Sequence, residues 1–363
     1  MSEAFHENLA LAALLSAPLS VGALLYWIFG VHRYHERHYA RRSAVMVANT
    51  LAIALVLSLA ALGGELYFRF VYDTTDAFGV TKTARRWLER HYAINATGMR
   101  DDVPAYSSTS SPGRPRITFL GDSFTAGYGV PDVGDRFANR VRAQRTDWEI
   151  LVFAVNGWDT GDQLRVLQSH PESELDRVVL VYTLNDISDI DPRWQAMREE
   201  LHETGRPQSY LTEHSFFLNW LHYRFMAWRD DTLSTYFDFQ LDVYHSSSEL
   251  WREQRRRLLA IRNLVHQRGG RLLVVTFPFL HSLGSGYPYR EAHEALAAFW
   301  KSIGVPHLDL LDAFEVVEAD DVAVNAYDAH PNEDAHAIAG NEILSWLQMH
   351  VPVSEHGVKE SSP

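Results

Sequence analysis

The sequence predicts an α/β protein with a five-stranded parallel sheet, preceded by an N-terminal transmembrane helical hairpin. Five short apolar runs have the length of buried strands, and helical patterns lie between them. Two long uncharged stretches precede all of these runs. Because strands that alternate with helices pair in parallel, we expect helices on both faces of the sheet.

The two uncharged stretches extend from Leu9 to Val31 and from Ser43 to Gly64. Each has about the 20 residues that a helix needs to cross the hydrocarbon of a bilayer. A cleaved signal peptide is the alternative for the first stretch, but its leader carries Glu3 and Glu7 and no Lys or Arg. We therefore expect residues 1–72 to form two transmembrane helices in the cell membrane.

The short link between the two stretches is basic, whereas the N-terminal tail has no Lys or Arg. Lys and Arg concentrate on the cytoplasmic side, which places the link in the cytoplasm and the domain that follows the hairpin on the extracytoplasmic side. Basic residues after the second stretch argue the other way, although long domains translocate largely regardless of charge. The link has Arg33, Arg37, Arg41 and Arg42, and the later set is Arg69, Lys82, Arg85, Arg86 and Arg90.

After the hairpin, composition divides the chain further. Residues 73–112 are predicted to be a membrane-proximal segment and a linker, because they end in the Ser/Pro-rich run SSTSSPGRP. Residues 113–350 are the predicted α/β domain, and residues 351–363 are a predicted disordered tail. An aromatic insertion at residues 209–244 is expected to cover the sheet as helices; a lid over an acyl pocket, or a contact with the membrane surface, is the alternative.

The strands are expected in the runs RITFL, WEILVFAV, RVVLVYT, GRLLVVTF and VPHLDLL. The clearest helix runs from Glu249 to Arg268, where apolar residues form one stripe and Gly269 and Gly270 end the pattern. In open parallel sheets, ligands bind at the carboxyl ends of the strands. The residues that follow each run are therefore the candidates for function.

Ser123 follows the first predicted strand in the sequence Gly121-Asp122-Ser123. A serine at a strand-to-helix turn can present its hydroxyl to a substrate, with its amide near the positive end of a helix. The same triplet also forms ordinary helix-capping turns. The turn alone therefore leaves both interpretations open.

His330 follows the last predicted strand and precedes a predicted helix from His336 to Met349. Serine needs a base to become a nucleophile, and His330 can reach across the carboxyl edge of the sheet to supply it. Asp328 is the nearest carboxylate that could orient the imidazole.

An oxyanion needs preorganised donors, and two candidates follow the intermediate strands. Gly157 can offer a backbone N–H, and Asn185 can offer its side-chain amide. Each is also a common turn residue.

Ser123, Gly157, Asn185 and His330 occur in that order after the first, second, third and fifth predicted strands. This ordered set resembles the SGNH (GDSL-like) hydrolase family, which is named for these four residue types. The resemblance covers roughly residues 114–349 and implies a flavodoxin-like α/β/α sandwich. It also implies that Ser123 is the nucleophile, that His330 is the base, and that the Ser123, Gly157 and Asn185 amides form the oxyanion hole.

Two positions depart from the family pattern. Thr183 stands where the third motif, Gly-x-Asn-Asp, has its glycine. The family aspartate usually lies three residues before the histidine, a position held here by Tyr327, with Asp328 one residue nearer. The orienting role of Asp328 therefore stays open, because a backbone carbonyl could share it.

Composition and motifs exclude several other classes. A net charge of −13 and a pI near 5.7 disfavour nucleic acid as a partner. With no cysteine there is no thiol nucleophile and no thiolate metal site. Asp328, His330, Asp334 and His336 could ligate a metal, but a metal would leave the Ser-Gly-Asn set unexplained. We expect neither a metal nor a cofactor.

These observations predict a serine esterase that acts through a Ser-His(-Asp) acyl-enzyme. A membrane hairpin with an outward domain suggests an acylated envelope glycan or lipid as substrate, and the bilayer as a partner. An O-acyltransferase that uses a sugar hydroxyl as acceptor is one alternative. A non-catalytic membrane-bound binding module is another.

Overall fold

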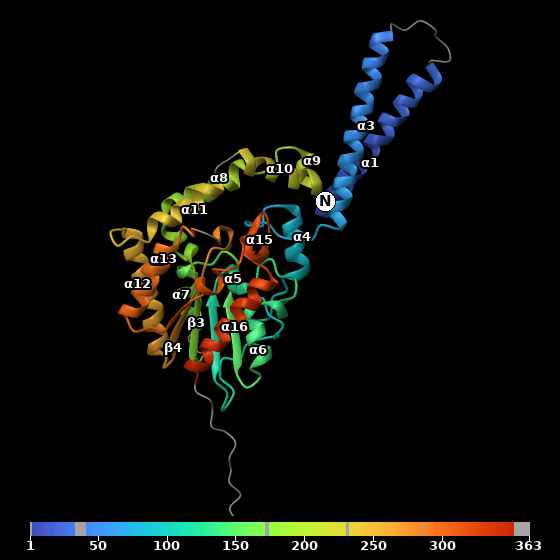
Figure 1. The fold of residues 1–363 in the computed structure, drawn as a ribbon. Helices are drawn as coiled ribbons and strands as arrows, with labels where there is room; N and C mark the ends of the chain where they lie inside the picture. Colours follow the sequence, from blue (N-terminus) through green and yellow to red (C-terminus); the bar gives the residue numbers. More distant parts are fainter. Residues whose placement is uncertain (1, 33–40, 171–173, 230–231, 285, 352–363) are drawn as a thin grey trace, which may run out of the picture. The chain divides into compact units, whose positions relative to one another are not determined.

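The computed structural model describes residues 2–32, 41–170, 174–229, 232–284 and 286–351 (Figure 1). Arg33 and Arg37 of the predicted basic link and the tail from residue 352 lie outside this part. The chain forms two compact units. The first, the hairpin unit, comprises residues 1–74, 79–87 and 200–231. The second, the sheet unit, comprises residues 75–78, 88–199 and 232–363.

The second unit is built on five parallel strands in the order β2-β1-β3-β4-β5. This confirms the predicted five-stranded parallel sheet. The strands are β1 (Arg116–Gly121), β2 (Glu149–Ala154), β3 (Arg177–Thr183), β4 (Arg271–Phe277) and β5 (His307–Asp309).

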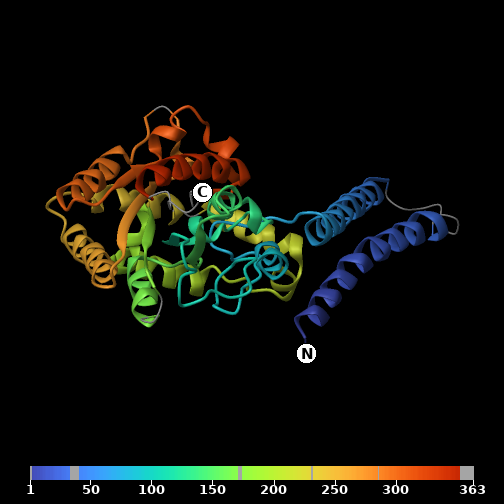
Figure 2. The same cartoon turned by 90° about the horizontal axis from the view of Figure 1, so that it is seen from below.

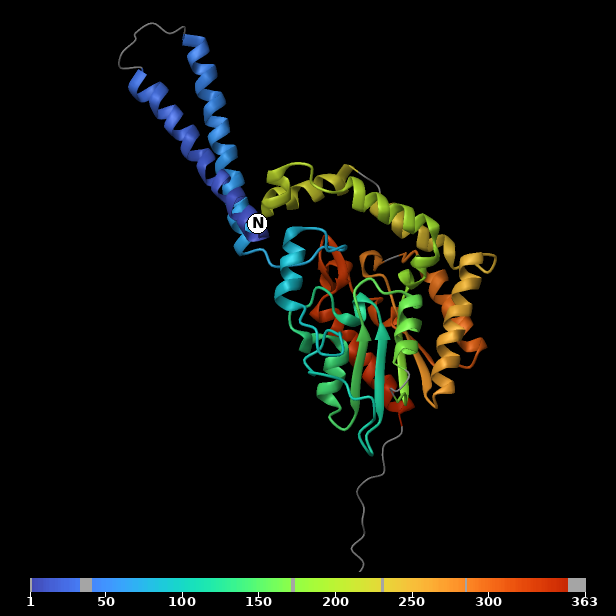
Figure 3. The same cartoon turned by 180° about the vertical axis from the view of Figure 1, so that it is seen from behind.

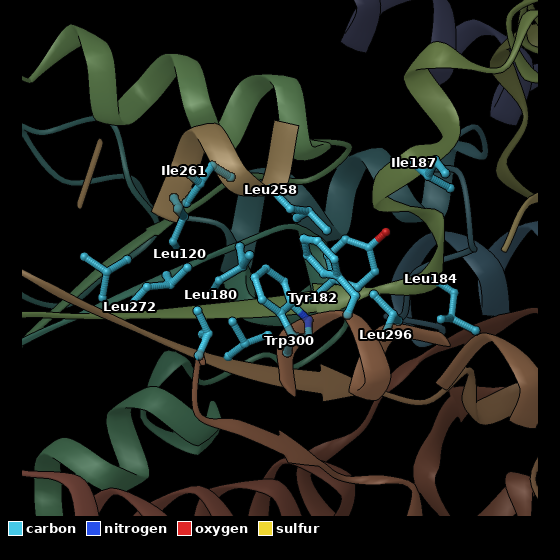
Figure 4. Packing of buried hydrophobic residues seen from close by; sticks show 14 of the residues in the cluster. Leu120, Leu180, Tyr182, Leu184, Ile187, Leu258, Ile261, Leu272, Leu296 and Trp300 are labelled. Carbon is cyan, nitrogen blue, oxygen red and sulfur yellow. The ribbon is translucent and has the colours of Figure 1, made fainter. Parts of the chain in front are cut away.

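Helices cover both faces of this sheet (Figures 1 and 3). Alternate residues of β3 point to opposite faces, so Leu180 and Tyr182 join one core cluster and Val179 and Val181 join the other. Figure 4 shows the first cluster, where Leu258 of α12 and Trp300 of α13 pack near Tyr182. The helices of the first face are α7 (Thr160–Ser169), α12 (Glu249–Gln267) and α13 (Arg290–Ser302), and those of the second are α6 (Phe137–Gln144) and α16 (Glu333–His350).

Shorter elements occupy the connections. Helix α16 begins before the predicted position at His336, because the Asn332 side chain caps it by accepting from the backbone of Asp334 and Ala335. The antiparallel pair β6–β7 was not predicted from the sequence. The remaining elements are α5 (Ser123–Ala126), η2 (Val133–Asp135), η3 (Leu184–Ile190), α8 (Pro192–Thr204), α11 (Thr232–Val243), η4 (Leu280–Ser282), α14 (Leu311–Phe314), α15 (Ala319–Val322), β6 (Ala323–Asn325) and β7 (Asp328–Pro331).

The strand order places a topological switch point between β1 and β3. The chain leaves β1 toward β2 on one side, whereas β3 continues toward β4 on the other. In sheets of this order, a crevice opens there at the carboxyl ends of the strands. Ser123 follows β1 and Asn185 follows β3, so both residues lie at this point.

The first unit contains the two apolar helices. Helix α1 (Glu3–Tyr26), continued by the π-helical η1 (Trp27–His32), lies beside α3 (Arg41–Phe70) (Figure 2). The segments Glu3–Phe29 and Val45–Phe70 are long and apolar enough to cross a membrane, with mean hydropathy of 1.9 and 2.3.

Four further helices belong wholly or partly to the first unit: α4 (Lys82–His91), the end of α8, α9 (Tyr210–His214) and α10 (Phe216–Arg229). The buried carboxylate of Glu65 on α3 accepts hydrogen bonds from Ser215 Oγ at 2.6 Å and from Phe217 N at 3.1 Å. Trp220 packs on Phe68 with ring centroids 4.5 Å apart. The predicted insertion at 209–244 is therefore divided, with α9 and α10 in the hairpin unit and α11 in the sheet unit.

Residues 88–112 belong to the sheet unit, which differs from the predicted linker. The reason is a buried charged cluster that composition does not reveal. Arg100 is buried, and Arg136 donates to its carbonyl oxygen at 2.8 Å. Arg142 pairs with the Asp101 carboxylate at 2.6 Å.

Candidate active site

Ser123 is the first residue of α5, directly after β1. Asp122 caps this short helix by accepting from Phe124 N at 2.9 Å. A side chain at Gly121 would meet Thr125 Oγ1 at 2.1 Å and the Val181 carbonyl oxygen at 3.0 Å. The turn that presents Ser123 therefore needs a glycine for close packing.

Three of the predicted site residues are in contact. Ser123 Oγ lies 2.9 Å from His330 Nε2. On the other side of the ring, His330 Nδ1 lies 2.5 Å from Asp328 Oδ1. Asp328 also accepts from the backbone N–H of His330 at 3.1 Å. The aspartate that stands one residue nearer than in the family pattern thus still reaches the imidazole.

The charges of His330 and Asp328 stabilise each other. Burial lowers the pKa of His330, but the charge and hydrogen bond of Asp328, with Asp122 and Asp76, outweigh burial and raise it. Burial raises the pKa of Asp328, but the charge of His330 and the hydrogen bonds from His330 and Thr75 lower it below its usual value. Asp328 is therefore held as a carboxylate against the imidazole.

The two predicted oxyanion donors follow the strands that flank β1. Gly157 lies after β2 in a turn with φ of 77°, a value that favours glycine. Asn185 lies in η3, directly after β3. Its Oδ1 atom is buried and accepts no hydrogen bond from the residues that the structure describes. Buried side-chain acceptors are normally paired, so this oxygen is an exception among the described residues.

Sequence comparison identifies the family of this chain. The profile of the "GDSL-like Lipase/Acylhydrolase family" matches residues 119–338, which is more than half of the chain. The chain belongs to this family. It is accordingly an ester-hydrolysing serine hydrolase of the GDSL type, as the sequence predicts.

Several solved structures are similar to this GDSL-like hydrolase. A lipolytic G-D-S-L protein from Veillonella parvula is 16% identical, with 64% of this chain and 98% of that chain covered and a TM-score of 0.40. An extracellular lipase from Streptomyces rimosus is 14% identical, with 65% and 100% covered and a TM-score of 0.41. The acetyl xylan esterase AlAXEase is 11% identical, with 64% and 99% covered and a TM-score of 0.41. Comparison with curated protein sequences found no match.

Thr183, which stands where the family motif has a glycine, forms a side-chain hydrogen bond in this GDSL-like hydrolase. Its hydroxyl donates to Asp122 Oδ2 at 2.8 Å and lies 3.4 Å from Asp186 Oδ1. Burial raises the pKa of both carboxyls, and the charge of Asp122 raises that of Asp186 further. The threonine therefore bridges the residue before Ser123 and the residue after Asn185.

Two aromatic rings border the imidazole. The centroids of Tyr128 and Phe124 lie 4.8 Å and 5.4 Å from that of His330. The loop that carries Tyr128 is held by Arg100, which donates to the carbonyls of Gly127 and of Val130, the latter at 2.5 Å. Sequence reasoning missed this role, because Arg100 lies in the segment interpreted as a linker.

Sequence reasoning also missed Thr75, whose hydroxyl donates to Asp328 Oδ2. No motif signals Thr75, because it lies 253 residues from Asp328 along the chain.

Among the candidate metal ligands, His336 is buried on α16 and its Nδ1 accepts from Phe137 N at 3.3 Å. Within the described ranges, no group of three or more His, Cys, Asp and Glu side chains could hold a metal ion.

Proposed function

We propose that this GDSL-like hydrolase cleaves esters through an acyl-enzyme on Ser123, with His330 as base and Asp328 as the orienting carboxylate. The observation that carries the proposal is the 2.9 Å contact between Ser123 Oγ and His330 Nε2. This is hydrogen-bond distance for proton transfer. Asp328 completes the chain by binding the opposite ring nitrogen.

In this mechanism His330 Nε2 takes the Ser123 proton while Ser123 Oγ attacks the ester carbonyl carbon. The bond to the alcohol then breaks, and His330 returns the proton to the leaving alkoxide. In the second half, His330 Nε2 takes a proton from water while the water oxygen attacks the acyl carbon. The bond to Ser123 Oγ then breaks, His330 returns the proton to Ser123, and the acid leaves. In each tetrahedral intermediate, the backbone amides of Ser123 and Gly157 and the side-chain amide of Asn185 stabilise the oxyanion.

The test is covalent labelling of the full chain in detergent micelles with a fluorophosphonate, followed by intact-mass analysis. We expect a single adduct that maps to Ser123 and forms far more slowly in His330→Ala. A folded chain without an adduct would contradict the proposal and favour the non-catalytic binding module.

The Asn185 side chain is expected to act on the transition state. Asn185→Ala should lower kcat by about 10² to 10³-fold, with little change in KM, because the lost donor binds the oxyanion and not the ground-state ester. Steady-state kinetics on a p-nitrophenyl ester measure both constants. Asn341→Ala, at an exposed position on α16, is the matched control. Equal effects of the two substitutions on kcat would contradict the proposed role of Asn185 in the oxyanion hole.

We propose that the hairpin anchors the enzyme in the cell membrane. The sheet unit, which contains the proposed catalytic residues and is called the catalytic unit from here on, then lies on the extracytoplasmic side. None of the most apolar window of Val45–Phe70 is buried inside the protein, so its side chains need an apolar solvent. The orientation follows from the basic link between the two helices.

Helix α10 supports contact with the bilayer surface. Leu221, Phe225 and Trp228 recur at helical spacing on one side, and they are 45%, 52% and 82% exposed. On the other side, Phe216 and Asn219 are buried in the hairpin unit. An amphipathic helix that packs on the end of a spanning helix suits the interfacial layer of a membrane.

The proposed topology predicts opposite labelling of two single-cysteine variants, which can be made directly because the chain has no cysteine. Ser345→Cys lies on the exposed side of α16 in the catalytic unit, and His38→Cys lies in the basic link. In intact cells, a membrane-impermeant maleimide should label Ser345→Cys only, whereas lysed cells should label both. Labelling of His38→Cys alone in intact cells would reverse the topology.

The anchor also bears on the substrate. An enzyme held at the outer surface of the cell membrane is close to the esters of the envelope. We therefore propose an acylated glycan or lipid as the substrate class. Release of acid from acylated oligosaccharides and from phospholipids, measured with the full chain in micelles, separates the two. Turnover of neither, with rapid cleavage of small soluble esters, would contradict this substrate class.

A further inference from the structure

A four-residue segment next to the hairpin is part of the catalytic unit. Residues 75–78 belong to the unit of the sheet, although the chain on both sides, 1–74 and 79–87, belongs to the hairpin unit. Helix α3 ends at Phe70, so this segment is the first part of the chain after the second apolar helix to enter the catalytic unit.

The segment is fastened to the turn between β6 and β7. Ala77 N donates to the carbonyl oxygen of Tyr327 at 3.1 Å, and Asn325 Nδ2 donates to that of Thr75 at 3.1 Å. Thr75 and Asp76 are only 3% and 4% exposed. The β6–β7 pair carries Asp328 and His330, so the segment lies against the part of the chain that supplies the base.

The Thr75 hydroxyl donates to Asp328 Oδ2. The other carboxylate oxygen, Oδ1, faces His330 Nδ1 at 2.5 Å and accepts from His330 N at 3.1 Å. Both oxygens of Asp328 are therefore bound, one by the imidazole and one by Thr75. A carboxylate held at both oxygens cannot rotate about its own axis without breaking a hydrogen bond.

The segment also supports the aromatic wall of the site. The Tyr128 hydroxyl donates to the carbonyl oxygen of Asp76 at 3.0 Å. The ring of the same tyrosine lies edge-on to His330 at 4.8 Å between centroids. Two of the surfaces that fix the imidazole, the Asp328 carboxylate and the Tyr128 ring, thus depend on residues 75 and 76.

We propose that Thr75 is a positioning residue of the active site, and that residues 75–78 make catalysis depend on the chain that leads out of the hairpin. The inference rests on the proposed roles of Ser123, His330 and Asp328. Without the Thr75 hydroxyl, the Asp328 carboxylate can turn and the imidazole loses its fixed direction toward Ser123. A displacement of about 1 Å in a catalytic group can cost about 10²-fold in rate.

The experiment compares three substitutions in the full chain in detergent micelles. Thr75→Val keeps the shape and removes the hydroxyl, whereas Thr75→Ser keeps the hydroxyl. Thr118→Val is the matched control, because Thr118 is buried on β1 and its hydroxyl has no partner among the described residues. The measurements are kcat/KM across pH, the rate of fluorophosphonate labelling, and Tm.

We expect Thr75→Val to lower kcat/KM and the labelling rate by about 10 to 100-fold, with KM nearly unchanged. The acid limb of the pH profile should move to lower pH, because an Asp328 carboxylate that turns away stabilises the His330 cation less. The other carboxylates that act on His330, Asp122 and Asp76, are unchanged in this variant. Thr75→Ser and Thr118→Val should retain rates within a few-fold of wild type.

The proposal is overturned if Thr75→Val matches Thr118→Val in rate and pH profile, or if Thr75→Ser is as impaired as Thr75→Val. If Thr75→Val does not fold, Thr75→Ala, which also removes the hydroxyl, is compared with Thr75→Ser in the same measurements, and equal rates for these two variants overturn the proposal. Failure of the underlying function is separate, since it would appear as a wild-type chain without an adduct on Ser123.

Discussion

Ser123→Ala is expected to lower kcat/KM for ester hydrolysis by at least about 10⁴-fold. The substitution removes the hydroxyl oxygen that lies 2.9 Å from His330 Nε2 and that forms the acyl bond in the proposed mechanism. Water cannot take over efficiently, because the covalent route divides one difficult step into two easier ones. The measurement is turnover of a p-nitrophenyl ester by the full chain in micelles, together with the adduct mass after fluorophosphonate treatment.

The control for this prediction is Ser345→Ala. Ser345 is an exposed serine on α16, and its hydroxyl bonds only to the backbone of its own helix. Its removal should leave turnover and the adduct unchanged. An adduct that persists in Ser123→Ala would show that another residue is the nucleophile, and unchanged turnover would contradict the acyl-enzyme on Ser123.

Asp328→Asn is expected to lower kcat by about 10³ to 10⁴-fold, because an amide at this position no longer holds the imidazole as a base directed at Ser123. It should also shift the pH profile. The charge of Asp328 raises the pKa of His330, and catalysis needs the neutral imidazole. Activity is therefore lost as pH falls through that pKa, and removing the charge should move the acid limb of kcat/KM to lower pH.

Asp334→Asn is the matched control for this substitution. Asp334 is an exposed acid in the first turn of α16, close to His330 in sequence, and it makes the same change in net charge. Its acid limb should stay where the wild-type limb lies, since exposed charges are screened by solvent and salt. If the acid limb of kcat/KM lies at the same pH in Asp328→Asn and Asp334→Asn, the pairing of Asp328 with His330 is contradicted.

Local signals in the sequence were enough to predict much of the fold. Strand β3 occupies the predicted run Arg177–Thr183 without change, because a continuous apolar run between turns can pair on both edges. Helix α12 occupies Glu249–Gln267, as its apolar stripe and the glycines after it predict. The carboxyl edge of a parallel sheet then brings Ser123 and His330 together, although they are 207 residues apart in the chain.

The family departures could be noted in the sequence but not resolved there. Whether Asp328 reaches His330 depends on the β6–β7 pair, which sets the direction of both side chains, and that pair has only three and four residues. Strands so short carry too little periodicity to predict. Likewise, a threonine at position 183 is readable, but its bond to Asp122 exists only because β1 and β3 are neighbours.

By itself, then, the sequence determined what depends on neighbours in the chain: the strands and main helices, the two apolar helices, and the residue types at the ends of the strands. The tertiary structure decided what depends on contacts between distant segments. It placed Thr75 on Asp328, Arg100 beneath the loop of Tyr128, and the aromatic helix α10 on α3. Periodicity reports how one segment divides between core and solvent, whereas a single hydrogen bond between residues hundreds of positions apart leaves no periodic trace.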